Sequence, residues 1–339
     1  MKILVTGGAG FIGCNFARLV LREHPEDEVV VLDKLTYAGR RENLRDLEGN
    51  PHFLFVQGDI CDEGVVRSLV SKVDAVVNFA AETHVDRSIL SATEFVRTNV
   101  QGVMVLCEAA RHAGVQRFVQ VSTDEVYGSV EVGSSRESDS FDPRSPYSAS
   151  KAGGELLALS YFTTHGVPVL VTRGANNYGP YQHPEKQIPL FTLKAIAGES
   201  LPVYGDGLQV RDRLHVEDHC AGIDLVLREG EAGEAYNIGA GQELTNLAVT
   251  EAIINAVGAS RDLITFVTDR AGHDRRYSLN CEKLRALGWQ PRHSFDEGLV
   301  ETVCWYRDNT WWWQSLLTGE HAAYFQANYG WRTATTGLV

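Results

Sequence analysis

The feature that most constrains the fold is a glycine-rich turn directly after the first apolar run. Lys2–Thr6 has the composition of a buried strand, and the run Gly7-Gly8-Ala9-Gly10-Phe11-Ile12-Gly13 follows it and opens a helical pattern. Glycines at 8, 10 and 13 fit G-x-G-x-x-G, and those at 7, 10 and 13 fit the related G-x-x-G-x-x-G. Because glycine lacks a Cβ, the backbone can approach a pyrophosphate at the positive end of the helix. The segment therefore predicts a dinucleotide-binding strand–turn–helix unit.

Strand-like runs alternate with helical patterns through the first half of the chain. We expect strands at 2–6, 29–33, 53–57, 75–80, 117–121 and 167–173, with helices near 63–72, 91–113 and 146–165. Apolar strands separated by helices imply a parallel sheet with right-handed crossovers. We predict an α/β fold: a doubly wound, Rossmann-type sheet in residues 1–175, to which some later segments return. Residues 176–318 are expected to form mainly a smaller substrate-binding lobe, and residues 319–339 a tail.

Charge and composition exclude several classes of partner. Acidic residues outnumber basic ones by 44 to 31, for a formal charge of −13, and such a surface repels nucleic acid and anionic membranes. No apolar run is long enough to span a bilayer or to form a signal-peptide core. The 6 cysteines and 11 histidines show no metal-ligand spacing. We expect a cytoplasmic protein with no metal, no nucleic acid and no membrane partner.

One carboxylate indicates which dinucleotide binds. Asp33 ends the second expected strand, 20 residues after Gly13. A carboxylate at this position accepts hydrogen bonds from the adenosine ribose hydroxyls and repels a 2′-phosphate. The sequence therefore favours NAD over NADP.

A second group of residues predicts proton transfer. Thr123 lies just past the fifth expected strand, at the carboxyl edge of the sheet, where ligands of α/β folds bind. Tyr147 and Lys151 are four residues apart and share a helix face, with Pro146 at a plausible first position and Ser145 as a cap. A phenol needs its pKa lowered by roughly three units to act as a base near neutrality. An ammonium about 4 Å away would supply about 4 kcal/mol. We therefore expect Lys151 to hold Tyr147 ionised.

With these motifs the chain resembles the extended short-chain dehydrogenase/reductase family, whose members oxidise a sugar hydroxyl of a nucleotide-sugar with bound NAD. The resemblance implies NAD contacts from the glycine loop and from Tyr147 and Lys151. The other implied NAD contacts are Asp33, Lys34, Leu35, Thr36, Asp59, Ile60, Ala80, Ala81, Thr83, Thr98 and Asn177. It also implies a homodimer, in which the helices near 91–113 and 146–165 pack against their copies.

The acidic pair Asp124-Glu125, directly after Thr123, resembles the dTDP-glucose 4,6-dehydratases of this family. The family's 4-epimerases generally carry small residues at 124 and 125, and its decarboxylases keep only the glutamate. The resemblance implies that Tyr147 takes the C4 hydroxyl proton while hydride passes to NAD, and that Thr123 hydrogen-bonds the same oxygen. Glu125 would then remove the C5 proton and a protonated Asp124 would donate to the departing C6 hydroxyl. Return of the hydride to C6, with reprotonation of C5, completes a net loss of water.

The resemblance also implies a set of substrate contacts. They are Thr83, Thr123, Asn176, Lys186, Tyr204, Arg211, Asn246, Asp269, Arg270 and His273. Arginine suits bidentate contacts with phosphate, so Arg211 is expected at the diphosphate.

Four departures from the family pattern leave the nucleotide and the sugar open. Gly174-Ala175 replaces a small polar pair, Gln187 a leucine, Arg213 a tryptophan and Ala271 a proline. The alternatives are a 4,6-dehydratase or 4-epimerase for another nucleotide-sugar, and a non-catalytic NAD-sensing protein. The downstream pathway also stays open.

Overall fold

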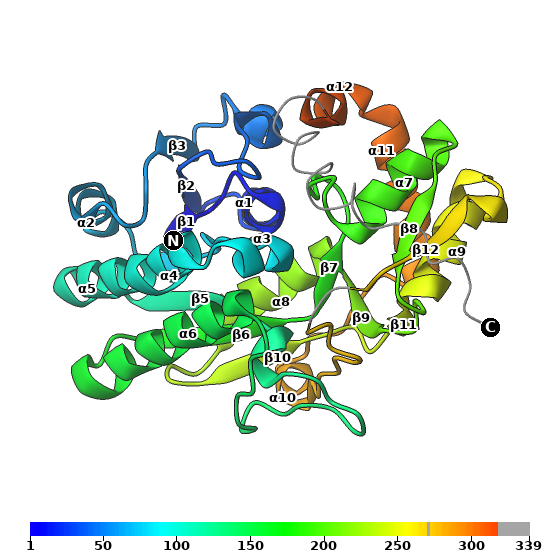
Figure 1. Ribbon diagram of the computed structural model, residues 1–339. Helices are drawn as coiled ribbons and strands as arrows, with labels where there is room; N and C mark the ends of the chain where they lie inside the picture. Colours follow the sequence, from blue (N-terminus) through cyan, green and yellow to red (C-terminus); the bar gives the residue numbers. More distant parts are fainter. Residues whose placement is uncertain (270–271, 318–339) are drawn as a thin grey trace.

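The computed structural model describes residues 1–269 and 272–317, and it has a seven-stranded sheet at its centre (Figure 1). All strand pairs in this sheet are parallel, in the order β10-β6-β5-β4-β1-β2-β3. The strands are β1 (Lys2–Thr6), β2 (Glu28–Asp33), β3 (Phe53–Gln57), β4 (Ala75–Asn78), β5 (Arg117–Thr123), β6 (Val169–Gly174) and β10 (Ala235–Ile238). The strand order reverses at β1, which lies between β2 and β4. The predicted doubly wound, Rossmann-type sheet is confirmed.

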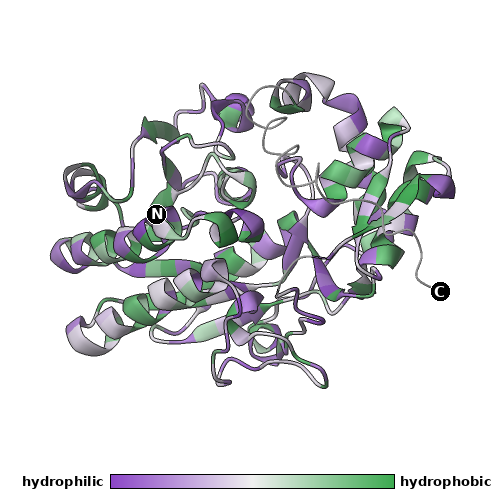
Figure 2. Cartoon of the chain, viewed as in Figure 1, coloured by the Kyte–Doolittle hydropathy of each residue, from purple (hydrophilic) through white to green (hydrophobic). Residues whose placement is uncertain are grey.

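Helices cover both faces of this sheet. The helices on one side include α1 (Phe11–Glu23) and α8 (Val216–Glu229), and those on the other include α2 (Glu63–Val70), α5 (Val103–Ala113) and α6 (Pro146–His165). Neighbouring residues of β1 enter different cores: Ile3 and Val5 pack on the α1 side and Leu4 on the α5 side. Since both faces are buried, the strands are almost continuously apolar (Figure 2).

The second half of the chain forms a smaller lobe beside the carboxyl ends of the large sheet (Figure 1). Its strands are β7 (Asn176–Tyr178), β9 (Val210–His215) and β11 (Glu243–Thr245) in one sheet, and β8 (Leu201–Tyr204) with β12 (Ile264–Val267) in another. The helices α7 (Gln187–Ala197), α9 (Asn246–Val257) and α11 (Phe295–Asp308) enclose its core. Strand β10, from the same half, joins the large sheet, where it pairs with β6.

The remaining elements are short. They are η1 (Arg41–Leu47), α3 (Val85–Leu90), α4 (Thr93–Val96), η2 (Arg97–Gly102), η3 (Asp124–Tyr127), η4 (Arg261–Leu263), α10 (Glu282–Ala286), α12 (Thr310–Trp313) and η5 (Gln314–Leu317). No helix within residues 1–269 and 272–317 combines the length and the apolar character needed to cross a bilayer.

The helix expected near 91–113 is interrupted by a π-helical turn, η2. The turn places Asn99 against the loop after β4 and against α6. Its side chain accepts from the Glu82 amide at 2.9 Å and donates to Ser150 Oγ at 2.9 Å. Such turns occur frequently at functional sites, and Thr98 in this one lies on the wall of a pocket described below.

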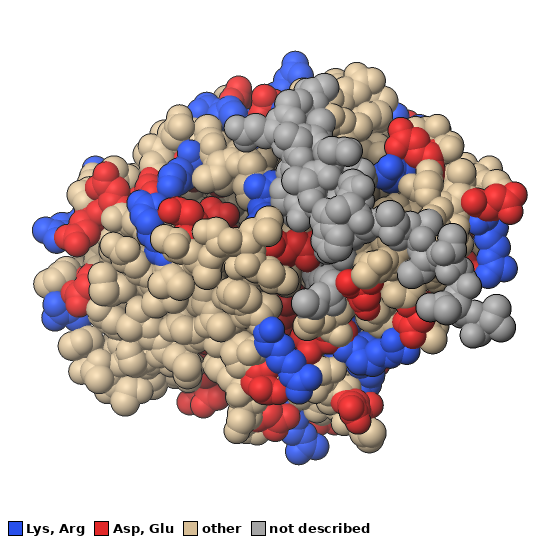
Figure 3. Space-filling model, viewed as in Figure 1, with Lys and Arg blue, Asp and Glu red and all other residues tan. Residues whose placement is uncertain are grey.

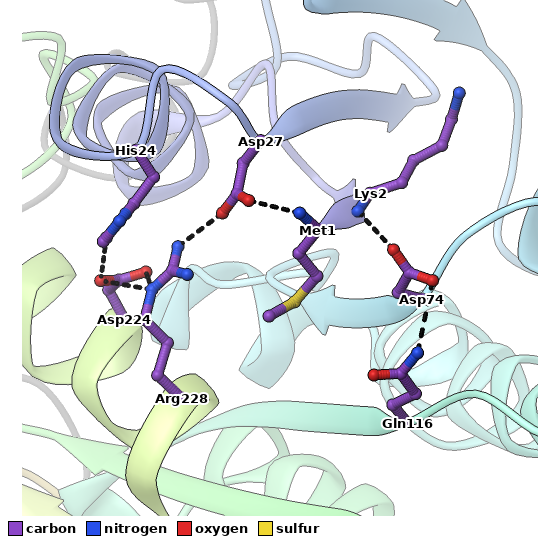
Figure 4. Close-up of polar contacts among 8 residues, drawn as sticks. All are labelled: Met1, Lys2, His24, Asp27, Asp74, Gln116, Asp224 and Arg228. Carbon is purple, nitrogen blue, oxygen red and sulfur yellow. Dashed lines mark hydrogen bonds and ion pairs between the residues drawn. The ribbon is translucent and has the colours of Figure 1, made fainter.

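A polar network connects the amino terminus, at the start of β1, with the end of α1 and with α8 (Figure 4). The amino group of Met1 contacts Asp27, which also accepts from Arg228 at 2.7 Å. Arg228 contacts Asp224 at 3.0 Å, and His24 lies 2.9 Å from the same carboxylate. Burial raises the pKa of Asp27, but the Met1 amino group and Arg228 outweigh it and the net pKa is lowered. The stabilisation from this carboxylate is therefore present above its unfolded pKa and is lost as the pH falls through the folded pKa.

A buried ion pair links β6 to α6 and supports a stability prediction. Arg173 contacts Glu155 at 2.5 Å, and both side chains are buried. Arg173→Met would leave a buried carboxylate unpaired, so we expect the free energy of unfolding to fall by about 3–5 kcal/mol in urea titrations. Arg261→Met, which breaks an exposed pair with Glu251, should cost about 1 kcal/mol or less. Equal losses in the two variants would contradict the prediction.

Candidate active site

Two adjoining pockets open at the carboxyl ends of the large sheet. The glycine-loop pocket, of about 1280 Å³, follows the ends of β1 to β4 and reaches β5 and α6. The lobe pocket, of about 1100 Å³, lies against α7, β8 and β9. Gln182, Glu185 and Lys186 line both pockets, so the two spaces meet at this segment.

The predicted cofactor residues gather around the first pocket. Its wall includes Gly7, Gly10, Phe11, Ile12, Gly13, Asp33, Lys34, Thr36, Asp59, Ile60, Ala80, Ala81, Thr83, Thr98, Tyr147 and Lys151. Two predicted cofactor residues lie elsewhere. Leu35 donates its backbone N–H to Asp33 at 2.8 Å, and Asn177 lines the lobe pocket.

The glycine loop has the backbone geometry that a pyrophosphate site needs. Gly7 has a φ of 67°, and a Cβ there would lie 2.6 Å from the backbone nitrogen of Ala80. A Cβ on Gly13 would lie 2.5 Å from the Gly7 carbonyl oxygen. No side chain caps the N-terminus of α1 at Gly10, so the first turn presents its amides to the pocket. The loop therefore fits the diphosphate of a dinucleotide.

Asp33 holds a carboxylate at the wall of this pocket. Its Oδ2 accepts from the Ala9 amide at 2.9 Å and its Oδ1 from the Leu35 amide at 2.8 Å. Burial raises the pKa of Asp33, and the two amides oppose that shift. Each carboxylate oxygen keeps acceptor capacity for a ligand hydroxyl, which fits the ribose of NAD.

Tyr147 and Lys151 stand on the first turns of α6. The helix begins at Pro146, and Ser145 caps it by accepting from the Ser148 amide at 3.1 Å, as expected from the sequence. Both side chains are buried on the wall of the glycine-loop pocket. The Lys151 ammonium donates to the Val121 carbonyl on β5 at 2.7 Å.

The surroundings of Tyr147 in the ligand-free chain favour its protonated form. Burial raises the pKa of Tyr147, and the charges of Glu125 and Asp124 raise it further. The Lys151 ammonium is directed to the Val121 carbonyl, and burial lowers its own pKa to about 8. The role expected for Lys151, which is to help hold the phenol ionised when an oxidised dinucleotide is bound, stays a prediction.

Asp124 and Glu125 occupy different environments although they are adjacent. Asp124 is 3% exposed, accepts from Thr123 Oγ1 at 3.1 Å, and has a buried Oδ2 without a hydrogen-bond partner. Burial and then Glu125 raise its pKa to about 8, although Arg211 opposes this. Glu125 lines the lobe pocket. The pair thus places a carboxyl group with a raised pKa beside a second carboxyl group that lines the lobe pocket, an arrangement suited to an acid and a base acting in one reaction.

The polar residues of the lobe pocket include six of the ten predicted substrate residues, namely Asn176, Lys186, Tyr204, Arg211, Asn246 and His273. Arg211 donates to the Asp274 carbonyl at 2.9 Å and lies 4.1 Å from the centroid of the Tyr277 ring. The Lys186 ammonium donates to the Thr83 carbonyl at 3.3 Å. Two buried or half-buried cations thus reach one pocket of an acidic protein, which suits an anionic ligand.

The other four predicted substrate residues differ in position. Thr83 lines the glycine-loop pocket, whereas Thr123 lines neither pocket and caps η3 by accepting from the Glu125 amide at 3.2 Å. Asp269 lines neither pocket, but its Oδ1 lies 2.7 Å from the Nδ1 of His273, which lines the lobe pocket. Arg270 lies outside the described residues, as do Ala271 and the tail 319–339.

Several pocket residues were not among the predicted site residues. Arg213, Gln187 and Tyr277 line the lobe pocket, and Glu185 lines both pockets. Burial raises the pKa of Glu185, which lies 3.6 Å from Arg87. The alternation of Arg211 and Arg213 on one strand was a usable signal, since residues two apart share a face. Nothing local in the sequence marked the others.

One group in the described ranges brings possible metal ligands together, away from both pockets. The ligand atoms of His215, His293 and Glu301 lie within 4.8 Å of one another. The two imidazole rings stack with 4.1 Å between their centroids and 30° between their planes. Asp218 also occupies the Nδ1 of His293 at 3.0 Å.

Comparison with known proteins places this arrangement in a family. The family model for GDP-mannose 4,6 dehydratase matches residues 4–302. The low-salt glycan biosynthesis protein Agl12 of Haloferax volcanii is 56% identical over 90% of this chain and 98% of that protein. A dTDP-glucose 4,6-dehydratase of an Actinoplanes species is 53% identical over 92% of this chain and 100% of that protein. A similar solved structure is that of DesIV, a dTDP-glucose 4,6-dehydratase from Streptomyces venezuelae, crystallised with NAD and TYD bound. Its sequence is 53% identical to this chain, and the two structures superpose with a TM-score of 0.91 over 93% of this chain and 100% of DesIV. The chain therefore belongs to the family that the GDP-mannose 4,6 dehydratase model describes.

Proposed function

We propose that this protein is an NAD-dependent hydro-lyase that converts dTDP-glucose to dTDP-4-keto-6-deoxyglucose in deoxysugar biosynthesis. The reaction oxidises C4, eliminates water across C5 and C6, returns the hydride to C6 and puts a proton back on C5. The observation that carries the proposal is the buried Asp124 carboxyl group, whose Oδ2 has no hydrogen-bond partner and whose pKa burial raises, next to Glu125 in the lobe pocket. A 4-epimerase has no elimination step and no use for such an acid.

The glycine-loop pocket would hold NAD, with Gly7 to Gly13 at the diphosphate and Asp33 at the adenosine ribose. NAD, when bound, accepts the C4 hydride and returns it at C6. The positive charge of its oxidised ring would favour ionisation of Tyr147, the influence that the chain alone lacks. The lobe pocket would hold the nucleotide-sugar, with Arg211, Lys186 and Asn246 toward its diphosphate.

Three side chains then divide the proton transfers. Tyr147 removes the C4 hydroxyl proton, and the ketone that forms acidifies the neighbouring C5–H. Glu125, which lines the lobe pocket, removes that proton. Asp124, with a pKa of about 8, carries the proton that the leaving C6 hydroxyl needs.

The experiment is to incubate the purified protein with dTDP-glucose and, separately, with UDP-, GDP- and CDP-glucose. We expect dTDP-glucose to yield a product lighter by one water, with a C6 methyl group in its proton NMR spectrum. A product of unchanged mass that is inverted at C4 would establish an epimerase instead. Turnover of only another nucleotide-glucose would retain the reaction and overturn the substrate. No product from any of them would favour a sensing role.

A homodimer is the proposed assembly, and the exposed surface of α5 and α6 supports it. This face is largely uncharged (Figure 3). Leu156 on α6 is 57% exposed, and Met104 on α5 and Phe162 on α6 are also exposed hydrophobic residues, as is Val96 at the end of the neighbouring α4. An apolar surface of this kind is typical of a protein–protein interface.

The six free cysteines are consistent with the reducing cytoplasm as the compartment.

Leu156→Asp is expected to convert the dimer to monomers. A carboxylate on this face would lose its hydration on association, which weakens association by at least about 10-fold. Sedimentation velocity across a concentration series measures the change. Val132→Asp, at an exposed hydrophobic residue outside α5 and α6, is the matched control and should remain dimeric. A monomeric wild type, or a dimeric Leu156→Asp variant, would refute this interface.

A further inference from the structure

The lobe pocket contains a buried guanidinium whose side-chain acceptors are neutral. Arg213 on β9 is 6% exposed and lines the pocket. Its Nη2 donates to Gln187 Oε1 at 3.0 Å and to Asn246 Oδ1 at 2.7 Å, and its Nε is buried without a hydrogen-bond partner. Amide oxygens orient a guanidinium but do not balance its charge. The buried cation is therefore incompletely compensated in the chain alone.

A second guanidinium lies on the same face of the strand. Arg211 is two residues before Arg213, is also buried, and lines the same pocket. Burial first, and the charge of Arg211 second, lower the pKa of Arg213 to about 9, although Asp212 and Asp124 oppose the shift. Two buried like charges on one wall are costly unless an anion with more than one negative charge lies between them.

Resting on the proposed function, we infer that Arg213 is a phosphate-binding residue that forms, with Arg211, a two-arginine clamp on the diphosphate of the nucleotide-sugar. Gln187 at the start of α7 and Asn246 at the start of α9 fix its Nη2. Its Nε, which is buried without a hydrogen-bond partner, then remains as a donor for a phosphate oxygen. The clamp favours a nucleoside diphosphate over a monophosphate, because only the diphosphate spans both cations.

Calorimetry with thymidine diphosphate and monophosphate, combined with thermal melting, tests this role. In Arg213→Met we expect the Kd for the diphosphate to rise about 10- to 100-fold, the loss expected for a hydrogen-bonded charge pair. The Kd for the monophosphate should rise about threefold or less. The ligand-free variant should melt at the same or a higher temperature than wild type, because an uncompensated buried charge is gone.

Gln187→Leu removes one of the two acceptors that hold the guanidinium. The charge of Arg213 stays in the pocket but its orientation is less restricted, so the Kd for the diphosphate should rise by a smaller factor, about 3- to 10-fold. This variant also keeps the test decisive if Arg213→Met does not fold.

Arg173→Met is the matched control, because Arg173 is also a buried strand arginine but is paired with Glu155 and lies outside both pockets. It should melt at a lower temperature and keep the wild-type Kd. If Arg213→Met behaves in the same way, Arg213 is structural and the inference is overturned while the proposed function stands. If wild type binds neither thymidine nor uridine diphosphate, the proposed function is overturned together with the clamp.

Discussion

Tyr147→Phe is expected to slow product formation from dTDP-glucose by about 10²–10⁴-fold, the usual contribution of a positioned proton acceptor. The phenol is buried on the wall of the glycine-loop pocket, at the start of α6, and the substitution removes only its oxygen. Binding should be retained, so the Kd for the nucleotide-sugar should stay within about threefold of wild type. Single-turnover rates measured with saturating ligand test the prediction.

The pH dependence gives this prediction a sign. Burial and the charges of Glu125 and Asp124 raise the pKa of Tyr147, so the fraction of phenolate grows as the pH rises. The oxidation step in wild type should therefore accelerate with pH until the phenol is ionised in the complex, whereas the residual rate of Tyr147→Phe should not show this rise.

Tyr161→Phe is the matched control, because Tyr161 lies on the same helix and donates to Glu108 at 2.9 Å outside both pockets. Its turnover should equal that of wild type. Equal turnover by Tyr147→Phe and wild type would show that another group accepts the C4 proton.

Local sequence signals predicted the elements that place the catalytic side chains. The run Lys2–Thr6 forms β1 as expected, since β-branched and apolar residues suit a strand that is buried on both faces. Pro146 and Ser145 start α6 as expected, because a fixed φ and a side-chain cap act within one turn of the helix. Strand β5 extends to Thr123, so Asp124 lies at the sheet edge where α/β folds bind ligands.

Local sequence signals could not predict the features that depend on contacts between residues far apart in the chain. The pKa of Tyr147 in the ligand-free chain depends on burial and on carboxylates from another element, and the spacing of Tyr147 and Lys151 in the sequence shows neither. Arg213 and Gln187 meet across 26 residues because β9 and α7 pack at one pocket, and sequence comparison showed only that each departs from a family pattern. The π-helical turn at Arg97–Gly102 likewise has no local marker that separates it from an α-helix.

Asp124→Asn and Glu125→Gln are expected to stop the reaction at different points, each lowering product formation by about 10²–10⁴-fold. Glu125→Gln should abolish exchange of the C5 hydrogen with solvent deuterium while C4 oxidation continues, because the amide cannot accept that proton. Asp124→Asn should retain C5 exchange but fail to release the C6 hydroxyl, because the amide is too weak an acid to supply the proton. NMR of dTDP-glucose incubated in deuterated water distinguishes the two failures.

Stability provides an independent readout of the Asp124 assignment. The pKa of Asp124 in the folded chain is raised to about 8, from an unfolded value of about 3.9. Ionisation therefore favours the unfolded chain, and this residue reduces stability increasingly as the pH rises from about 4 to about 8. Asp124→Asn removes the titration, so the variant should gain at least about 1 kcal/mol over wild type at pH 8 relative to pH 5 in urea unfolding.

Glu137→Gln is the control for both measurements, because Glu137 accepts from the Asn237 amide at 2.9 Å and lines neither active-site pocket. It should retain C5 exchange, water loss and turnover. If Asp124→Asn and Glu125→Gln both block C5 exchange, or if Asp124→Asn gains no stability at pH 8, then Asp124 is not the buried neutral acid. Another group would then have to supply the proton for elimination. The C6 hydroxyl cannot depart as hydroxide into a pocket that also holds the carboxyl group of Glu125.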